Sequence, residues 1–172
     1  MPVIDQSIRE DRLTFTFPEG SLSSKYDEWS HYRNQFNAAF GGTKAVDIVY
    51  ASTNTAWLIE VKDYRRHQRT KALDLADEIG FKVRDTLAGL ISASTLANDT
   101  DERRVAQALL EKRQWRVVLH LEIPPSRSRL WPRAIEPDKV QQKLKTLVRA
   151  IDPHPTVVSQ SSLKPDMDWV VT

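Results

Sequence analysis

Three charged residues, Asp47, Glu60 and Lys62, have types and spacing that could do chemistry. They lie in two apolar stretches, residues 44–51 and 56–64, joined by a short polar segment of serine, threonine and asparagine. Two carboxylates can bind a hard divalent cation, and a nearby lysine can hold a water molecule or offset charge on a phosphoryl group. These residues therefore indicate a candidate metal site.

The alternation of side chains predicts that this triad shares one face of a β-hairpin. A hairpin symmetric about the polar segment places Tyr50 opposite Trp57 and Asp47 opposite Glu60. Directly facing residues have Cβ atoms about 4.5–5.5 Å apart, and alternate residues share a face, so Lys62 joins the two acids. The other face is expected to form a core layer of six residues: Val46, Ile48, Tyr50, Trp57, Ile59 and Val61.

Two facing carboxylates repel each other unless a cation compensates them. Mg²⁺ can do so, because it takes one or two carboxylates and keeps several waters. The alternative is a surface ion-pair cluster of Asp, Lys and Glu on a solvent-facing sheet. The residues by themselves leave both interpretations open.

The elements that must position these residues follow from periodicity and from turn and cap signals. Strands are expected over residues 12–17, 44–51, 56–64, 115–123, 156–159 and 168–171. Helices are expected over residues 24–40, 73–94, 102–113 and 137–151. Ser24 is expected to cap the first of these, with an apolar stripe of Tyr26, Trp29, Phe36 and Phe40. This order predicts an α/β fold, a mixed β-sheet flanked by helices with a central antiparallel hairpin carrying the site.

Composition places the chain among ordinary globular proteins. It has 172 residues, 40% of them hydrophobic and 28% charged, with a net charge of +2 and no cysteine. Disulfides and thiolate metal sites are thus excluded. We expect one domain over residues 1–172, with a core of about 24–123 and a C-terminal extension of 124–172. No apolar run reaches the length of a membrane span and no secretory signal is recognisable, so a cytoplasmic location is expected by default.

Basic residues are concentrated in residues 65–71 and 127–133. The first segment directly follows the stretch with Glu60 and Lys62, and it holds Arg65, Arg66, His67, Arg69 and Lys71. These side chains could neutralise phosphates and give salt-dependent affinity for nucleic acid. In the second segment, Trp131 could stack on a base or anchor a loop. A solvated charge run is the alternative for each segment.

The pattern of an Asp, twelve residues, and then Glu60-Val61-Lys62 within apolar strands resembles the PD-(D/E)XK nuclease superfamily. Residues 24–123 could supply its common core, the restriction-endonuclease-like fold. The resemblance implies that Asp47 and Glu60, with the Val61 carbonyl, bind Mg²⁺ or, as a substitute, Mn²⁺. It also implies that Lys62 positions the hydrolytic water. Val46 stands where the family name places proline.

The resemblance also implies further residues. Family members often carry an acid on the first helix, for which Glu28 and Asp27 are the candidates, and Glu28 is taken as a possible additional acid. Lys82 and Arg84 on the following helix resemble basic residues that some relatives use to contact nucleic acid.

The expected function is therefore a Mg²⁺-dependent nuclease that hydrolyses phosphodiester bonds; the resemblance favours DNA as the substrate, and the residues leave RNA open. A homodimer or larger complex is plausible, because one such site cuts one strand. The alternatives are a non-catalytic module of the same fold that binds nucleic acid or protein, and a structural or regulatory subunit.

Overall fold

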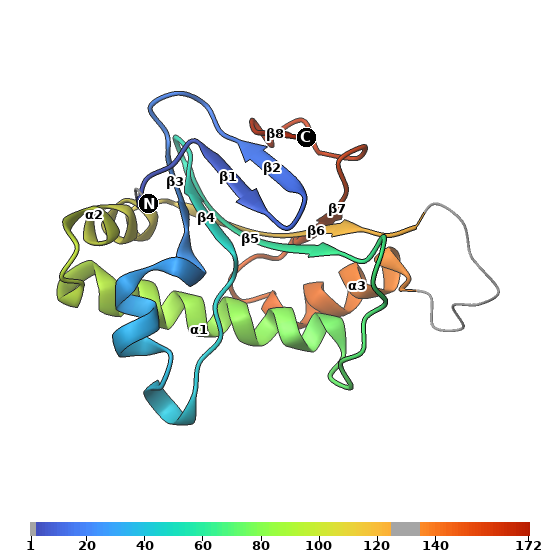
Figure 1. Ribbon diagram of the computed structural model, residues 1–172, viewed down its shortest axis with the longest axis horizontal. Coiled ribbons are helices and arrows are strands. Elements are labelled where there is room, and N and C mark those ends of the chain that lie inside the picture. The colour runs from blue at the N-terminus through green and yellow to red at the C-terminus, as the bar shows by residue number, and fades with distance from the viewer. Residues whose placement is uncertain (1–2, 125–134) are drawn as a thin grey trace.

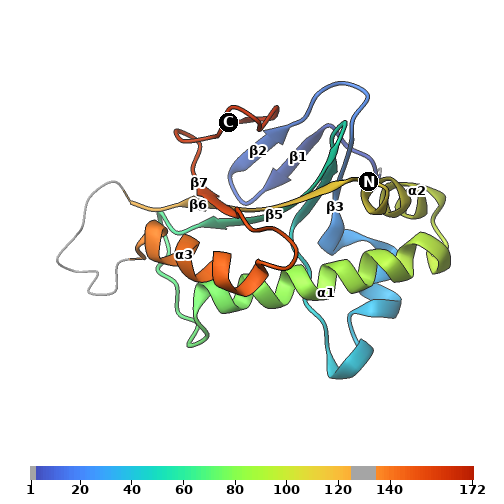
Figure 2. The same cartoon turned by 180° about the vertical axis from the view of Figure 1, so that it is seen from behind.

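The computed structural model describes residues 3–124 and 135–172 of the chain. Within them, a larger β-sheet lies between a smaller sheet on one face and helices on the other (Figure 1). The view from behind shows the same layers, with α1 and α3 side by side under the larger sheet (Figure 2). The basic segment 127–133, including Trp131, lies outside the described residues.

The larger sheet has the strand order β3-β4-β5-β6-β7. Its strands are β3 (Leu22–Lys25), β4 (Ile48–Ala51), β5 (Thr55–Asp63), β6 (Gln114–Glu122) and β7 (Thr156–Val158). The first three are antiparallel, whereas β6 is parallel to β5 and β7 is parallel to β6. Central β5 extends four residues beyond its pairing with β4, from Glu60 to Asp63. One backbone edge there is free of a strand partner among the described residues, and the candidate site lies at this edge.

The smaller sheet has the order β1-β2-β8 and is antiparallel throughout. Its strands are β1 (Ser7–Glu10), β2 (Leu13–Thr16) and β8 (Val170–Val171), so it joins the two ends of the described chain. A cluster of aromatic and aliphatic side chains fills the space between the two sheets, among them Phe15, Phe17, Tyr50, Trp57 and Trp169.

Three α-helices cover the other face of the larger sheet: α1 (Leu75–Leu96), α2 (Thr100–Leu110) and α3 (Pro137–Val148). The carboxylate of Asp74 caps α1 by accepting from the amide of Ala76 at 2.9 Å, and Asp99 caps α2 by accepting from Asp101 at 2.8 Å. Pro137 begins α3, where its missing N–H costs no helical hydrogen bond. The apolar faces of these helices form the second core cluster with Leu58, Val117 and Leu119.

The mixed α/β class that the sequence predicts is confirmed, as is the pairing of Tyr50 with Trp57. The expected helix over residues 24–40 is wrong. Ser24 lies in β3 opposite Val49, where its hydroxyl accepts from the indole N–H of Trp29 at 2.6 Å. Because its hydroxyl is used in this way, Ser24 caps no helix.

Three short turns replace the expected first helix: η1 (Tyr26–Glu28), η2 (Tyr32–Phe36), which is a single π-helical turn, and η3 (Ala39–Gly41). Strand β4 begins at Ile48 rather than at residue 44. Val46, expected beside Ile48 and Tyr50, packs instead in the cluster under the helices, and its amide donates to Thr86 Oγ1 at 3.0 Å. The chain is not yet a regular strand at Val46, so simple alternation fails there.

Candidate functional site

The two carboxylates of the predicted triad meet where β4 ends and β5 continues. Ile48 pairs with Ile59, which places Asp47 and Glu60 at the next position of the hairpin. Both side chains are buried on the sheet face that α1 covers. The sequence-based register therefore describes the meeting of the two carboxylates correctly.

Asp47 is held by the backbone of β5 and by a cation from α1. Its Oδ2 accepts from the Val61 amide at 2.7 Å, and its Oδ1 lies 3.7 Å from Lys82 Nζ. The amide and the carbonyl of one β-strand residue point to the same side, so the Val61 carbonyl also points to the edge that carries Asp47. A cation there could meet this carbonyl and the carboxylates together.

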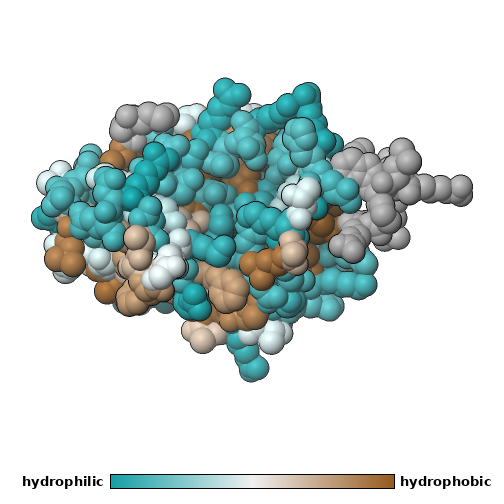
Figure 3. Space-filling model, turned by 60° about the horizontal axis from the view of Figure 1, so that its bottom comes forward, coloured by the Kyte–Doolittle hydropathy of each residue, from teal (hydrophilic) through white to brown (hydrophobic). Residues whose placement is uncertain are grey.

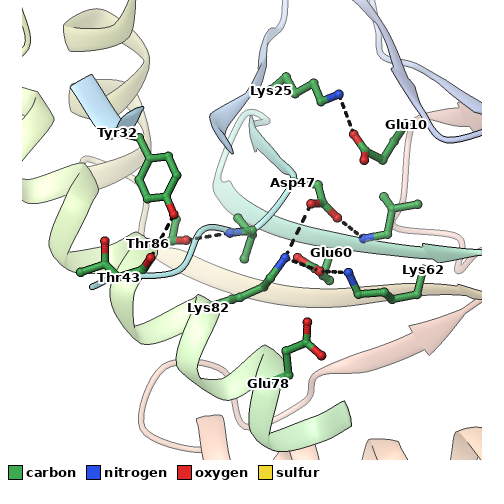
Figure 4. Close-up of polar contacts among 12 residues, drawn as sticks. Glu10, Lys25, Tyr32, Thr43, Asp47, Glu60, Lys62, Glu78, Lys82 and Thr86 are labelled. Carbon is green, nitrogen blue, oxygen red and sulfur yellow. Dashed lines mark hydrogen bonds and ion pairs between the residues drawn. The ribbon is translucent and has the colours of Figure 1, made fainter. Parts of the chain in front are cut away.

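Glu60 lies between two lysines. Its Oε1 is 2.6 Å from Lys62 Nζ and 2.6 Å from Lys82 Nζ, whereas Oε2 has no hydrogen-bond partner among the described residues (Figure 4). Burial and then the Asp47 carboxylate raise the pKa of Glu60 to about 7, against the opposing effect of the two lysines. Both protonation states of Glu60 are therefore accessible near neutral pH.

The side chain of Lys62 is protonated and positively charged. Burial by itself would lower the pKa of Lys62, but the carboxylates of Glu60 and Asp47 outweigh it and raise that pKa. A lysine held in this way is a fixed positive charge and a poor proton acceptor. It can stabilise an anionic ligand, such as a phosphate, but it cannot act readily as a general base.

Lys82 is the residue whose position the sequence did not reveal. It was expected on a helix face that contacts nucleic acid, whereas its ammonium points into the carboxylate pair (Figure 4). The Asp74 cap fixes the start of α1, and Glu78 and Lys82, four residues apart, then point along one face toward β5. Its nucleic-acid contact stays a prediction.

An additional acid lies near Asp47, and it is Asp27 rather than Glu28. The Glu28 carboxylate lies 3.2 Å from Lys25 Nζ and 3.9 Å from Arg33 Nη2. Asp27 instead lines a hollow of 320 Å³ together with Asp47 and Lys82. Burial raises the pKa of Asp27 to about 6, with the charge of Asp47 adding to the effect.

The predicted cations after β5 fall into two groups: some are held in ion pairs with carboxylates, and others are exposed and line a hollow. Arg65 is paired with Asp63 at 2.6 Å. Arg69 and Lys71 lie 2.8 Å and 2.6 Å from the carboxylate of Glu78, which is only 1% exposed. These contacts fix the course of the loop from residue 64 to residue 74.

A second hollow of 480 Å³ lies between this loop and the turn that joins β1 and β2. Arg12, Arg66 and His67 are exposed side chains that line it, and Tyr64 contributes a half-buried phenol. Farther along, Arg84 is paired with Asp85 at 3.0 Å, and its guanidinium lies 5.1 Å from the centre of the Phe81 ring. Binding of nucleic acid by these cations stays a prediction.

The candidate metal site has two close carboxylates and one carbonyl. Among residues 3–124 and 135–172, no group of three or more His, Cys, Asp or Glu side chains is placed to hold a metal ion. The ammoniums of Lys62 and Lys82 compensate part of the charge of the two acids, while Glu60 Oε2 has no hydrogen-bond partner among the described residues.

Comparison with known proteins gives one relationship. A cysteine–tRNA ligase from Neisseria meningitidis serogroup A / serotype 4A (strain DSM 15465 / Z2491) is 36% identical in an alignment of 156 residues, and the match covers 73% of this chain. The matched part is 22% of the ligase, so the chain spans less than a quarter of this relative's length. No family model and no solved structure matches the chain. Within the described residues, no helix is long and apolar enough to cross a membrane.

This comparison corrects the functional interpretation. The relative is named as a ligase, so the prediction of a phosphodiester-hydrolysing nuclease of the PD-(D/E)XK superfamily is wrong. The alternative, a non-catalytic module on that fold, gains no support either. With no matching solved structure, the restriction-endonuclease-like assignment is left without support, and the described fold stands as a mixed α/β arrangement of two sheets and helices.

Proposed function

We propose that this chain serves a function related to aminoacyl-tRNA synthetases, and that its part in that function is to bind tRNA. The observation that carries the proposal is the 36% identity over 156 residues with a protein named cysteine–tRNA ligase. The expected nucleic-acid ligand is therefore tRNA, and the earlier preference for DNA has no support.

The exposed cations beside β5 that form no ion pair within the described residues support this proposal. Arg12, Arg66 and His67 border one hollow, and none of them is held by an ion pair within the described residues. Phosphate groups of RNA are recognised through such exposed cations, which displace counterions and give affinity that falls with salt. The loop that carries Arg66 and His67 is fixed by Glu78, so binding there requires little additional ordering.

We further propose that Asp47, Glu60 and the Val61 carbonyl bind a hydrated Mg²⁺ or, in its place, Mn²⁺. Two observations support this proposal: Glu60 Oε2 has no hydrogen-bond partner among the described residues, and the Val61 amide donates to Asp47 at the edge of β5 to which the Val61 carbonyl also points. Mg²⁺ usually keeps several waters, so a site with few protein ligands suits it. Such an ion would join the carboxylates to a phosphate of the bound RNA.

The test is a binding titration with fluorescently labelled cysteine-accepting tRNA, a second tRNA and a DNA duplex of similar length. We expect the native chain to bind tRNA more tightly than the DNA. Replacing both Arg12 and Arg66 with alanine should weaken tRNA binding and reduce the slope of log K against log salt by about one for each lost phosphate contact.

Arg104→Ala is the matched control, because Arg104 is an exposed cation on α2, away from the hollow. It should leave the affinity for tRNA unchanged. Equal affinity for all three nucleic acids, or an Arg12/Arg66 double variant that binds as the native chain does, would overturn the proposal.

A further inference from the structure

A phenylalanine in the turn before β4 is almost fully exposed. Phe40 is 89% exposed and has a backbone φ of +56°, a left-handed conformation that bulky residues rarely adopt. Gly41 and Gly42 follow with φ values of +82° and +117°. An exposed aromatic ring held in an unfavourable backbone conformation has a cost in folding, and such positions concentrate at ligand contacts.

The turn is braced by hydrogen bonds, so the backbone that carries Phe40 has a defined position. The Thr43 amide donates to the Asn37 carbonyl at 2.8 Å, and the Thr43 hydroxyl donates to the Phe36 carbonyl at 2.8 Å. The Tyr32 hydroxyl donates to the Thr43 carbonyl at 3.1 Å. The ring of buried Phe36 is 6.2 Å from the ring of Phe40 and supports it from one side.

The surroundings of this ring suit a flat ligand. A Cβ atom added at Gly41 or Gly42 would meet nothing within 4 Å, so the space beside the turn is open. The segment that carries η3 projects beyond α1 in both ribbon views (Figures 1 and 2). In the view from below, apolar side chains form separate patches in a mostly hydrophilic surface (Figure 3).

A hydrogen-bonding group and a cation follow the turn directly. Thr43 and Lys44 line the hollow that also contains Asp27 and Asp47, and the Lys44 side chain is exposed, whereas the Lys82 ammonium at this hollow is held by Glu60 and Asp47. An exposed aromatic ring next to a cation is the combination that proteins use for single-stranded nucleic acid, in which bases stack on rings and phosphates meet cations.

We infer that Phe40 stacks on an unpaired base of the bound RNA, while Lys44 contacts the adjoining phosphate. This inference rests on the proposed tRNA binding and adds to it the recognition of an unpaired nucleotide. Because stacking does not read the edge of a base, Phe40 should contribute affinity for unpaired segments with little preference among the four bases.

The test compares Phe40→Ala, Phe40→Leu and Phe40→Trp with the native chain. Each is titrated with tRNA, with an RNA hairpin that has an unpaired loop, and with a fully paired RNA duplex. Val170→Ala is the control, because Val170 is an apolar side chain that is 59% exposed on β8. Melting temperatures of all variants are measured alongside.

We expect Phe40→Ala and Phe40→Leu to lose about tenfold in affinity for tRNA and the hairpin, and to keep native affinity for the duplex. Phe40→Trp should retain the native affinity, and Val170→Ala should match the native chain.

Several outcomes would overturn this inference. Unchanged RNA affinity of Phe40→Ala would remove the stacking role while leaving tRNA binding by the native chain intact. A Phe40→Leu variant that binds RNA as the native chain does would indicate a non-specific apolar contact in place of stacking. If the native chain binds no RNA at all, the proposed function fails together with this inference.

Discussion

Lys82 on α1 places its ammonium 2.6 Å from Glu60 Oε1 and 3.7 Å from Asp47 Oδ1, and so joins the helix to both acids of the hairpin. The pair of facing carboxylates is stable because this cation and Lys62 lie beside it. A carboxylate that is 1% exposed needs such partners, since an uncompensated buried charge is costly. The candidate site therefore also stabilises the packing of α1 against the larger sheet.

Replacement of Lys82 by methionine should lower the free energy of unfolding by about 1–3 kcal/mol, less than for a fully buried pair because Lys62 still contacts Glu60. Urea denaturation measures this change. Lys139→Met is the control, because Lys139 and Glu136 form an exposed pair on α3. Exposed ion pairs contribute about 0.2–1 kcal/mol to the free energy of unfolding, so this variant should change it little. A Lys82→Met variant as stable as the control would show that the contacts to Glu60 and Asp47 do not stabilise the fold.

The hairpin was predictable because its register is determined by residues that are close together in the sequence. Alternation over residues 55–63 and a short polar turn fix the register, and the structure has the expected pairing of Tyr50 with Trp57. The α-helices and β6 were predictable for a similar reason: each is nine or more residues long and has a clear apolar period. Long periodic elements carry their own signal in the sequence.

The remaining features depend on contacts between distant residues. A strand was expected over residues 168–171, and β8 lies within it, but its pairing with β2, more than a hundred and fifty positions earlier, is revealed by no local pattern. Likewise, the entry of Lys82 between Asp47 and Glu60 depends on how α1 packs against β5. Phe40 fits the helical spacing of Tyr26, Trp29 and Phe36. However, its own positive φ and those of the two glycines that follow end the helical path, and its side chain is exposed.

Because of His120, the free energy of unfolding should decrease in mild acid. Its side chain is fully buried in β6 against Phe15, and Nε2 lies 2.9 Å from Glu122 Oε1. Burial lowers the pKa of His120 below its ordinary value of 6.5, although the charge of Glu122 opposes this effect. The folded chain therefore favours the neutral ring, and protonation favours the unfolded chain. Stability should be fully present above pH 6.5 and decline as the pH falls through the lowered pKa.

The measurement for His120 is the free energy of unfolding as a function of pH. His120→Gln removes the titrating ring and keeps a donor for Glu122, so the decline below pH 6.5 should become shallower. His67→Gln should retain the native profile, because His67 is exposed. A His120→Gln profile that parallels the native one would assign the decline to other groups.

Mg²⁺ should stabilise the folded chain through Asp47 and Glu60. A ligand that binds only the folded state at ten times its Kd adds about 1.4 kcal/mol, which raises the melting temperature by roughly 3 °C or more in a chain of this size. Thermal unfolding with and without millimolar Mg²⁺ or Mn²⁺ measures the shift. Glu60→Gln should abolish it, whereas Glu111→Gln, a change at an exposed position after α2, should not. An equal shift in both variants would place the ion elsewhere.

The two glycines inside α1 should respond in opposite ways to alanine. A Cβ atom at Gly89 would lie 2.0 Å from the Tyr26 hydroxyl and 3.1 Å from Phe36 Cδ1, both on buried rings. Gly89→Ala should therefore force the segment with η1 and η2 away from α1 and cost roughly 1–3 kcal/mol or more. At Gly80, the added Cβ would meet the exposed Leu147 side chain at 3.5 Å, an ordinary contact.

Gly80→Ala should raise the free energy of unfolding by up to about 1 kcal/mol, because alanine restricts the unfolded chain and favours the helix. Urea denaturation of the two variants under one set of conditions gives the comparison, with each variant serving as the control for the other. Equal effects at the two positions would mean that helix propensity alone decides them. Opposite signs would show that Gly89 is required by the close approach of Tyr26, which also fixes the segment leading to Phe40 and Asp47.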